Sequence, residues 1–172
     1  MPYPAYAAGA ELTGADLSLS DLIGRTVFSA TRDTAQSIAT NTNPVVGNAI
    51  SWETVEADLF GAWAAGNPTR WTAPFAGWWT LMGATAINAV ASSAGLARFN
   101  AWFINGSLAV AGSNRIAAAP SNATATTNAR TRAYLLAAGD YVELIAGQDS
   151  SGAVNSSTGS LRPYIQVQFS GN

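Results

Sequence analysis

The stretch RWTAPFAGWWTLMGATAINAVASSAGLA, residues 70–97, decides the fold class of this chain. After its first residue it carries no charge up to Arg98, but Pro74, Gly77 and Gly83 interrupt it and no basic belt follows it, so we reject a membrane-spanning helix. Two sets of residues alternate through its centre, as in a β-strand: Phe75, Trp79 and Leu81 against Ala76, Trp78, Thr80 and Met82. Both sets are largely apolar, so the strand needs two covers, its own core and either a second sheet or a neighbouring subunit.

The composition indicates one domain with an unusually neutral surface. The chain has 172 residues, of which 48% are hydrophobic and 10% charged, where a soluble domain usually has about 25% charged residues. Its 16 glycines and its short Ser, Thr and Asn runs favour a loop-rich, all-β protein. The formal net charge is -2. We therefore expect neither nucleic acid nor an anionic membrane as a partner, because phosphate binding needs a clustered basic surface.

The absence of cysteine and histidine restricts the chemistry. Without them the chain has no cysteine nucleophile, no Ser-His-Asp triad, no zinc site of the usual ligands and no disulfide. We expect no catalytic set, no cofactor and no metal. The first residues, MPYPAYAAGAELTGADL, contain neither a positively charged region nor a long apolar region. We therefore also expect no signal peptide.

The N-terminal region is expected to contain an arm and one helix. Residues 1–15 are small and punctuated by proline and glycine, and they have too little apolar surface to fold alone. Residues 16–28 are the one helical candidate, although their last three residues would also suit a strand. The apolar and aromatic residues of this region are the candidates for contact with whatever the arm lies against: Tyr3, Tyr6, Leu19, Leu22 and Ile23.

Short strand candidates separated by turn residues follow from residue 34 onward. Asn105-Gly106 is the strongest hairpin signal. Residues 112–130 are polar and low in complexity, so we expect a long loop or an irregular edge there. About seven or eight such strands without βαβ alternation favour a sandwich or jelly roll. In the last strand the alternation is clean, with Ile165, Val167 and Phe169 inward and Tyr164, Gln166 and Gln168 outward.

Three groups of polar residues have both a functional and a structural interpretation. Glu53, Glu56 and Asp58 are either carboxylates for glycoside hydrolysis or a solvated strand edge. The loop residues Asp140 and Asp149 could hold a calcium ion or belong to metal-free turns. The basic doublet Arg130 and Arg132 could clamp a ligand, or it could be ion-paired or solvated.

Six tryptophans are a further open feature. They could form an aromatic platform for sugars, or they could fill the core and a subunit interface. Most lie at alternating positions in strand candidates, which favours burial. The residues are Trp52, Trp63, Trp71, Trp78, Trp79 and Trp102.

Four segments in order resemble the jelly roll of the globular heads of the first complement component and of tumour necrosis factor. They are TAPFAGWWTL (72–81), FING (103–106), LLAAGDYVEL (135–144) and YIQVQF (164–169). Pro74, Gly77 and Trp79 match a Pro-x-x-Gly-x-aromatic strand, Asn105 and Gly106 an Asn-Gly hairpin, and Gly139, Asp140 and Val142 a Gly-Asp-x-Val strand. The resemblance implies an all-β jelly-roll sandwich that forms a homotrimer.

The variant that the chain looks most like occurs in phages of actinobacteria. Ala15 to Leu17 is similar to its A-D-L helix start, W-E-T at 52–54 to its next strand, and Asp58 to Trp63 to its D-x-x-G-A-W loop. Such proteins are minor capsid, decoration or minor tail proteins. The resemblance implies a virion protein, assembled in the cytoplasm of the bacterial host and located on the particle surface.

These inferences combine into one prediction. Residues 1–33 form an anchoring arm with a short helix, and residues 34–172 form the jelly-roll domain. Attachment to the particle is assigned to the apolar and aromatic residues of the arm and helix named above. The protein is a non-enzymatic, trimeric capsid decoration or head-fibre protein that binds the major capsid protein or another virion protein. The alternative is a tail adhesin that recognises host surface glycan. The expected core or trimer-interface residues are Phe75, Trp78, Trp79, Leu81, Phe99, Phe103, Val142, Leu144, Ile165, Val167 and Phe169.

Overall fold

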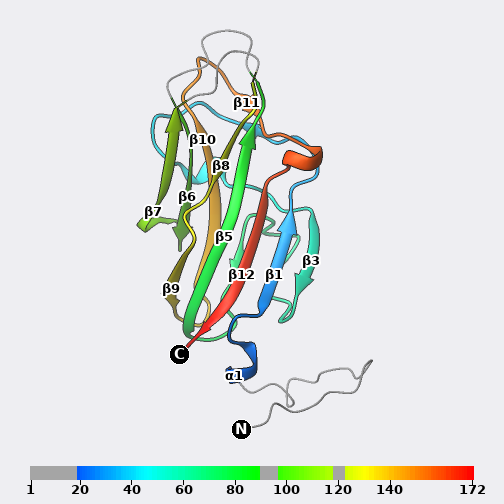
Figure 1. Cartoon of the computed structure of the whole chain (residues 1–172), viewed down its shortest axis with the longest axis vertical. Helices are drawn as coiled ribbons and strands as arrows, with labels where there is room; N and C mark the ends of the chain where they lie inside the picture. Colours follow the sequence, from blue (N-terminus) through cyan, green and yellow to red (C-terminus); the bar gives the residue numbers. More distant parts are fainter. Residues whose placement is uncertain (1–18, 90–96, 118–122) are drawn as a thin grey trace.

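Two antiparallel β-sheets make up most of the computed structural model, which describes residues 19–89, 97–117 and 123–172. The larger sheet has the strand order β3-β1-β12-β5-β8, and β9 also pairs with β5 (Figure 1). Its strands are β1 Thr26–Thr31, β3 Thr54–Asp58, β5 Gly77–Ile87, β8 Ala125–Asn128, β9 Arg132–Leu136 and β12 Tyr164–Gly171. The chain is therefore the all-β sandwich that its alternating pattern predicted.

The second sheet has four strands in the order β4-β10-β6-β7. They are β4 Trp71–Thr72, β6 Ala97–Ile104, β7 Ser107–Ala117 and β10 Tyr141–Gln148. A small pair adds β2 Ser37–Ile38 and β11 Val154–Asn155, and the helical turns are α1 Leu19–Leu22, η1 Val46–Asn48 and η2 Gly159–Leu161. No helix among the described residues is long and apolar enough to cross a membrane.

The core between the sheets is centred on an aromatic cluster. The ring of Trp79 on β5 lies 4.9 Å from that of Phe169 on β12 and 5.1 Å from that of Trp71 on β4, centroid to centroid. Phe75, in the loop before β5, packs 5.0 Å from Trp79. These contacts join strands of both sheets, so the cluster fixes how the sheets face each other. Further members of the core from the expected set are Leu81, Val142, Leu144, Ile165 and Val167.

The outer side of the four-stranded sheet is covered by loops of the same chain. Phe103 and Ile145 form a second buried cluster with Ala49, which follows η1. Phe99 is also buried, with the guanidinium of Arg115 4.9 Å from its ring centroid. The strands β6 and β10 are therefore covered on both faces, whereas Trp78 on the outer face of β5 is 43% exposed.

The hairpin prediction at Asn105-Gly106 is confirmed. The two residues link β6 to β7 with φ values of 51° and 76°. This left-handed backbone is what a tight hairpin turn between twisted strands requires. The predicted alternation of β12 is confirmed as well, because Ile165, Val167 and Phe169 are each fully buried between more exposed neighbours.

The predicted helix at 16–28 is wrong beyond Leu22. The described part of it contains only the four-residue α1, and Thr26–Thr31 forms β1 between β12 and β3. A β-bulge at Val27 lets both Val27 and Phe28 point into the core, which breaks the two-residue period. The sandwich therefore begins at β1 and not at residue 34.

Of the two alternatives for residues 112–130, the irregular edge fits the described residues and the long loop does not. β7 continues to Ala117, and Ala125–Asn128 forms β8 at the edge of the larger sheet. Alternate residues of β8, Ala125 and Thr127, are buried, so the strand has a period of two but little apolar character. Residues 118–122 lie outside the described part of the chain.

Gly83 on β5 lies so close to its neighbours that any side chain there should destabilise the fold. A Cβ there would lie 2.7 Å from the backbone oxygen of Tyr164 and 3.0 Å from Cδ2 of Leu144. We expect Gly83→Ala to lower the free energy of unfolding by about 1–3 kcal/mol, because the backbone of β12 cannot move away without breaking its pairing. Gly66→Ala, where nothing lies within 4 Å, is the control. Equal urea midpoints for the two variants would contradict this packing.

Candidate functional site

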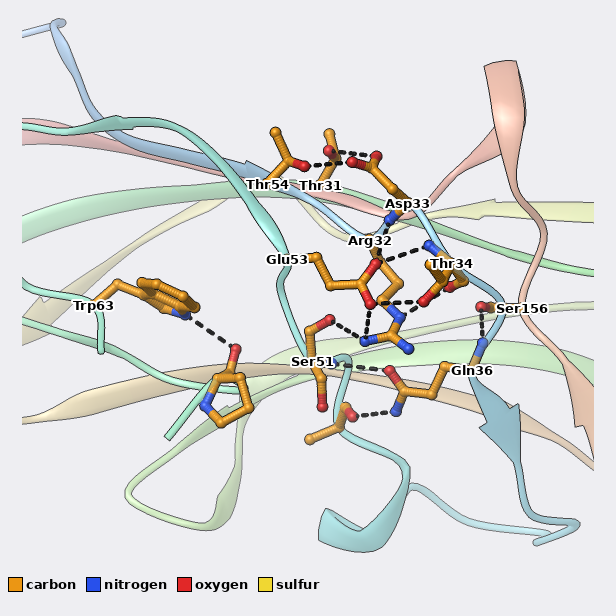
Figure 2. Close-up of polar contacts among 12 residues, drawn as sticks. Thr31, Arg32, Asp33, Thr34, Gln36, Ser51, Glu53, Thr54, Trp63 and Ser156 are labelled. Atoms are coloured by element: carbon orange, nitrogen blue, oxygen red, sulfur yellow. Dashed lines mark hydrogen bonds and ion pairs between the residues drawn. The ribbon is translucent and has the colours of Figure 1, made fainter. Parts of the chain in front are cut away.

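The first expected carboxylate, Glu53, lies in a polar network at the end of β1 (Figure 2). One oxygen accepts hydrogen bonds from the backbone N–H groups of Asp33 and Thr34, at 3.0 and 2.8 Å. The other accepts from the Thr34 hydroxyl at 2.6 Å and is 2.9 Å from the guanidinium of Arg32. The Thr34 hydroxyl, with the Thr34 N–H and Arg32, holds the pKa of Glu53 below its ordinary value.

Asp33 is the second hub of this network. Its carboxylate accepts hydrogen bonds from the hydroxyls of Thr54 and Thr31 and pairs with Arg162. The Thr54 hydrogen bond is the main cause that lowers the pKa of Asp33, and Thr31 and Arg162 act in the same direction. The network thus ties the end of β1 to β3 and to the segment that precedes β12. Its role is to fasten the strands together.

The structure does not gather the three carboxylates proposed for glycoside chemistry into one site. Glu56 accepts a hydrogen bond from the Ser29 hydroxyl at 2.7 Å on the outer face of the larger sheet. Asp58 accepts the backbone N–H groups of Ala62 and Trp63 at 2.9 and 3.1 Å and so closes the turn after β3. Each carboxylate makes its own structural contact, which fits the solvated-edge interpretation.

The two aspartates considered for calcium lie beyond opposite ends of β10. Asp140 accepts from the Asn105 amide and the Ala137 N–H, both at 2.7 Å, which lower its pKa in that order. Asp149 accepts the Ala97 N–H at 2.8 Å. Because an eight-residue strand spans about 26 Å, the two cannot share an ion.

The tryptophans divide between the core and the surface. Four are fully buried: Trp52, Trp71, Trp79 and Trp102. Trp63 is half-buried, with its indole N–H donating to the Pro68 carbonyl at 3.1 Å. Only Trp78, at 43% exposure, presents a large part of its ring to solvent. The six residues therefore do not form a sugar platform.

Part of the outer face of β5 is apolar and exposed. Trp78 pairs directly with Leu135 on β9, and Met82 lies on the same face beyond the polar Thr80, whereas Ala84 further along this face is buried. Leu135 is 64% exposed, and Tyr164, which pairs with Ala84 on the other side, is 41% exposed. We name Trp78, Met82, Leu135 and Tyr164 the outer stripe. Within the described part of the chain Met82 is half-buried, and the other three side chains of the outer stripe remain 41–64% exposed.

A second exposed apolar surface lies on β7, the edge strand of the four-stranded sheet. Leu108 is 52% exposed and Val110 is 79% exposed. Sequence reasoning missed these two residues and Leu135. Strand alternation could have identified Leu135, because it stands between Tyr134 and Leu136, whose side chains point to the opposite face and are buried.

The residues assigned to particle attachment have different environments. Leu19 and Ile23 are exposed at the end of the sandwich, where α1 lies below β1 and β12 (Figure 1). The assignment of Leu22 to attachment is wrong, because this side chain is buried in the main core and cannot contact a partner while the sandwich is folded. Tyr3 and Tyr6 lie outside the described residues.

The Glu53 network predicts an acid-sensitive contribution to stability. Because its pKa lies below the ordinary 4.5, the ionised carboxylate stabilises the fold above that pH, and this contribution is lost as the pH falls through the folded-state pKa. We expect Glu53→Gln to lower the free energy of unfolding at neutral pH by less than about 1 kcal/mol, since the group is largely exposed. In urea titrations, the difference from wild type should vanish in acid. Glu56→Gln is the control, and a pH-independent effect of Glu53→Gln would contradict this interpretation.

Comparison with known proteins identifies the fold. No protein-family model matches the chain, and no curated protein matches its sequence. The structure is similar to the globular domain of the zebrafish complement 1qA protein, with a TM-score of 0.55 and 9% identity over 84% of this chain and 97% of that one. It is also similar to Eiger TNF from S. frugiperda, with a TM-score of 0.56 and 7% identity over 84% of this chain and 92% of that one. The chain thus has the jelly-roll fold of the complement and tumour necrosis factor domains, as the sequence resemblance implied.

Proposed function

We propose that the chain is a non-enzymatic structural protein of a phage virion, a trimeric jelly-roll knob that decorates the capsid surface. The observation that carries this proposal is the outer stripe, a group of apolar side chains that the described part of a single copy leaves partly exposed. Large exposed apolar surface on a soluble protein indicates a contact with another protein. The phage assignment is supported by the A-D-L, W-E-T and D-x-x-G-A-W segments and their order in the sequence.

A cyclic trimer requires two different surfaces that meet at each contact. The outer stripe on β5 and β9 is one such surface, and the exposed β7 residues Leu108 and Val110 are the other. They lie on different parts of the sandwich, one on a sheet face and one on a sheet edge. Contact between the stripe of one copy and the edge of the next would give the homotrimer that the resemblance implies.

The N-terminal segment is the proposed anchor to the particle. Leu19 and Ile23, 41% and 57% exposed, lie where residues 1–18 join the sandwich. Together with the tyrosines at positions 3 and 6, they would bind the major capsid protein or another virion protein. The knob would be assembled in the host cytoplasm and remain on the particle surface.

The proposed trimer predicts melting that depends on protein concentration. The melting temperature of the wild-type chain should rise with concentration, since association stabilises the folded state by mass action. We expect Leu135→Asp and Val110→Asp each to abolish this dependence, because each places a charge in the apolar contact. Leu161→Asp, at a 46% exposed leucine in η2, should retain it. A wild-type melting temperature that is independent of concentration would contradict the trimer.

Attachment through the N-terminal segment predicts the composition of particles. In phage that carry a chain without residues 1–18, the truncated protein should melt as the full chain does but be absent from gradient-purified particles. Particles with Leu161→Asp should keep the protein at its normal copy number. Quantitative immunoblotting of purified particles makes the comparison. Truncated protein on particles at the normal level would overturn the anchor, and absence of the full-length chain from particles would overturn the virion assignment.

A further inference from the structure

Two irregular segments lie next to each other on one edge of the sandwich. In β7, residues 109–112 bulge out, because Ser113 pairs with Ala101 whereas Leu108 pairs with Phe103. In the larger sheet, residues 129–131 separate β8 from β9, which pair with successive parts of β5. β-bulges often re-aim side chains beside functional sites. Here both edges depart from regular pairing at the same place.

Trp102 holds both irregular segments from inside the core. Its indole N–H donates a 2.8 Å hydrogen bond to the carbonyl of Arg130. Its own backbone oxygen is so close to Gly112 that a Cβ there would lie 3.2 Å away. Ala111, beside that glycine, has the left-handed φ of 54°, which is uncommon for a residue with a side chain. The irregular backbone is thus fastened to a fully buried residue, which makes it a defined part of the fold.

An open cavity of about 440 Å³ lies between the two segments. Ligand pockets usually measure about 300–1,000 Å³, so the space is large enough for a small ligand. Its lining contains two cations and several neutral polar groups, and no carboxylate belongs to it. The lining residues are Ala111, Asn114, Asn128, Ala129, Arg130, Thr131 and Arg132.

The two guanidinium groups of this cavity are not neutralised by the part of the chain that the structure describes. Neither Arg130 nor Arg132 forms an ion pair there, whereas Arg32, Arg70 and Arg162 each do. Arg132 lies over the ring of Tyr134, 5.5 Å from its centroid. Burial raises the pKa of Tyr134, and the charges of Arg132 and Arg130 oppose that shift. Two unpaired guanidinium groups with fixed backbones are suited to bind an oxyanion.

The neutral groups of the cavity provide further hydrogen-bonding capacity. The Asn114 amide donates to the Asn128 backbone carbonyl at 2.7 Å, which leaves its own side-chain oxygen available as an acceptor. Among the described residues, the side chains of Asn128 and Thr131 have no hydrogen-bond partner, and both are exposed. A simple anion would leave these groups unused, whereas a ring with several hydroxyl groups would engage them.

We propose that this edge cavity binds an acidic monosaccharide unit, a hydroxylated ring that carries one oxyanion. Arg130 and Arg132 bind the oxyanion, and Asn114, Asn128 and Thr131 bind the ring hydroxyls. The inference does not rest on the proposed virion function, because the cavity is formed within a single copy of the chain. On a virion, such a site would allow the knob to contact acidic glycans of the host surface.

Titration calorimetry with the full-length protein tests the site. D-glucuronate and glucose 6-phosphate are the acidic probes, and their comparison distinguishes a carboxylate from a phosphate as the oxyanion. Glucose, acetate and inorganic phosphate are the controls for the ring alone and the anion alone. We expect saturable binding of at least one acidic sugar, weakened by added salt, with every control at least about tenfold weaker. No binding of either acidic sugar, or an anion alone that binds as tightly, would overturn the proposal.

Variants connect the binding to the cavity. We expect Arg130→Gln and Arg132→Gln each to weaken the acidic sugar about tenfold or more, since each removes a charge-assisted hydrogen bond. Arg25→Gln removes the same charge from an exposed residue outside the cavity and should leave the affinity unchanged. Asn128→Ala should weaken the sugar but not inorganic phosphate. Equal effects of Arg25→Gln and Arg130→Gln would contradict the site.

The test also distinguishes this proposal from the trimer. Binding by the Leu135→Asp variant but not by the wild-type protein would show that a neighbouring copy covers the cavity, and would overturn the proposal for the assembled protein. Binding by both proteins would support it whatever their state of association.

Discussion

The packing of Trp79 against Phe169 and Trp71 holds the two sheets of the sandwich against each other. It joins β5 and β12 of the larger sheet to β4 of the smaller one within ring distances of about 5 Å. Once Trp79 points inward, the two-residue period of β5 forces Trp78 outward. The same constraint that builds the core therefore also creates the outer stripe, so core and proposed interface are two faces of one strand.

Regular alternation is the part of the fold that could be predicted from the sequence. The inward residues of β12 and the hairpin at Asn105-Gly106 follow from local patterns, since a strand period and a left-handed turn each have a local signature. β1 could not be predicted in this way. Its bulge buries two successive residues, Val27 and Phe28, and the pairing that causes the bulge comes from β12, about 140 residues further along the chain. β8 was missed for another reason, because it is an edge strand made of alanine, threonine and asparagine.

The candidate sites were less predictable than the fold, because they depend on contacts between distant segments. The carboxylates at 53, 56 and 58 are close in sequence, yet the structure gives each a separate partner. The arginines at 130 and 132 were visible as a doublet, but their shared cavity exists only because the bulge of β7 lies beside the break between β8 and β9. Leu22 shows the opposite case, since its position beside β12 turned an expected contact residue into a core residue.

If a second copy of the chain covers the exposed side chains of the outer stripe, the purified full-length protein is an oligomer in solution. Light scattering measures its mass without a label or a variant. We expect a trimer, with a mass near three times the 17.7 kDa of one chain. A mass of a single chain across the accessible concentrations would contradict it, because the outer stripe would then be a surface exposed to water.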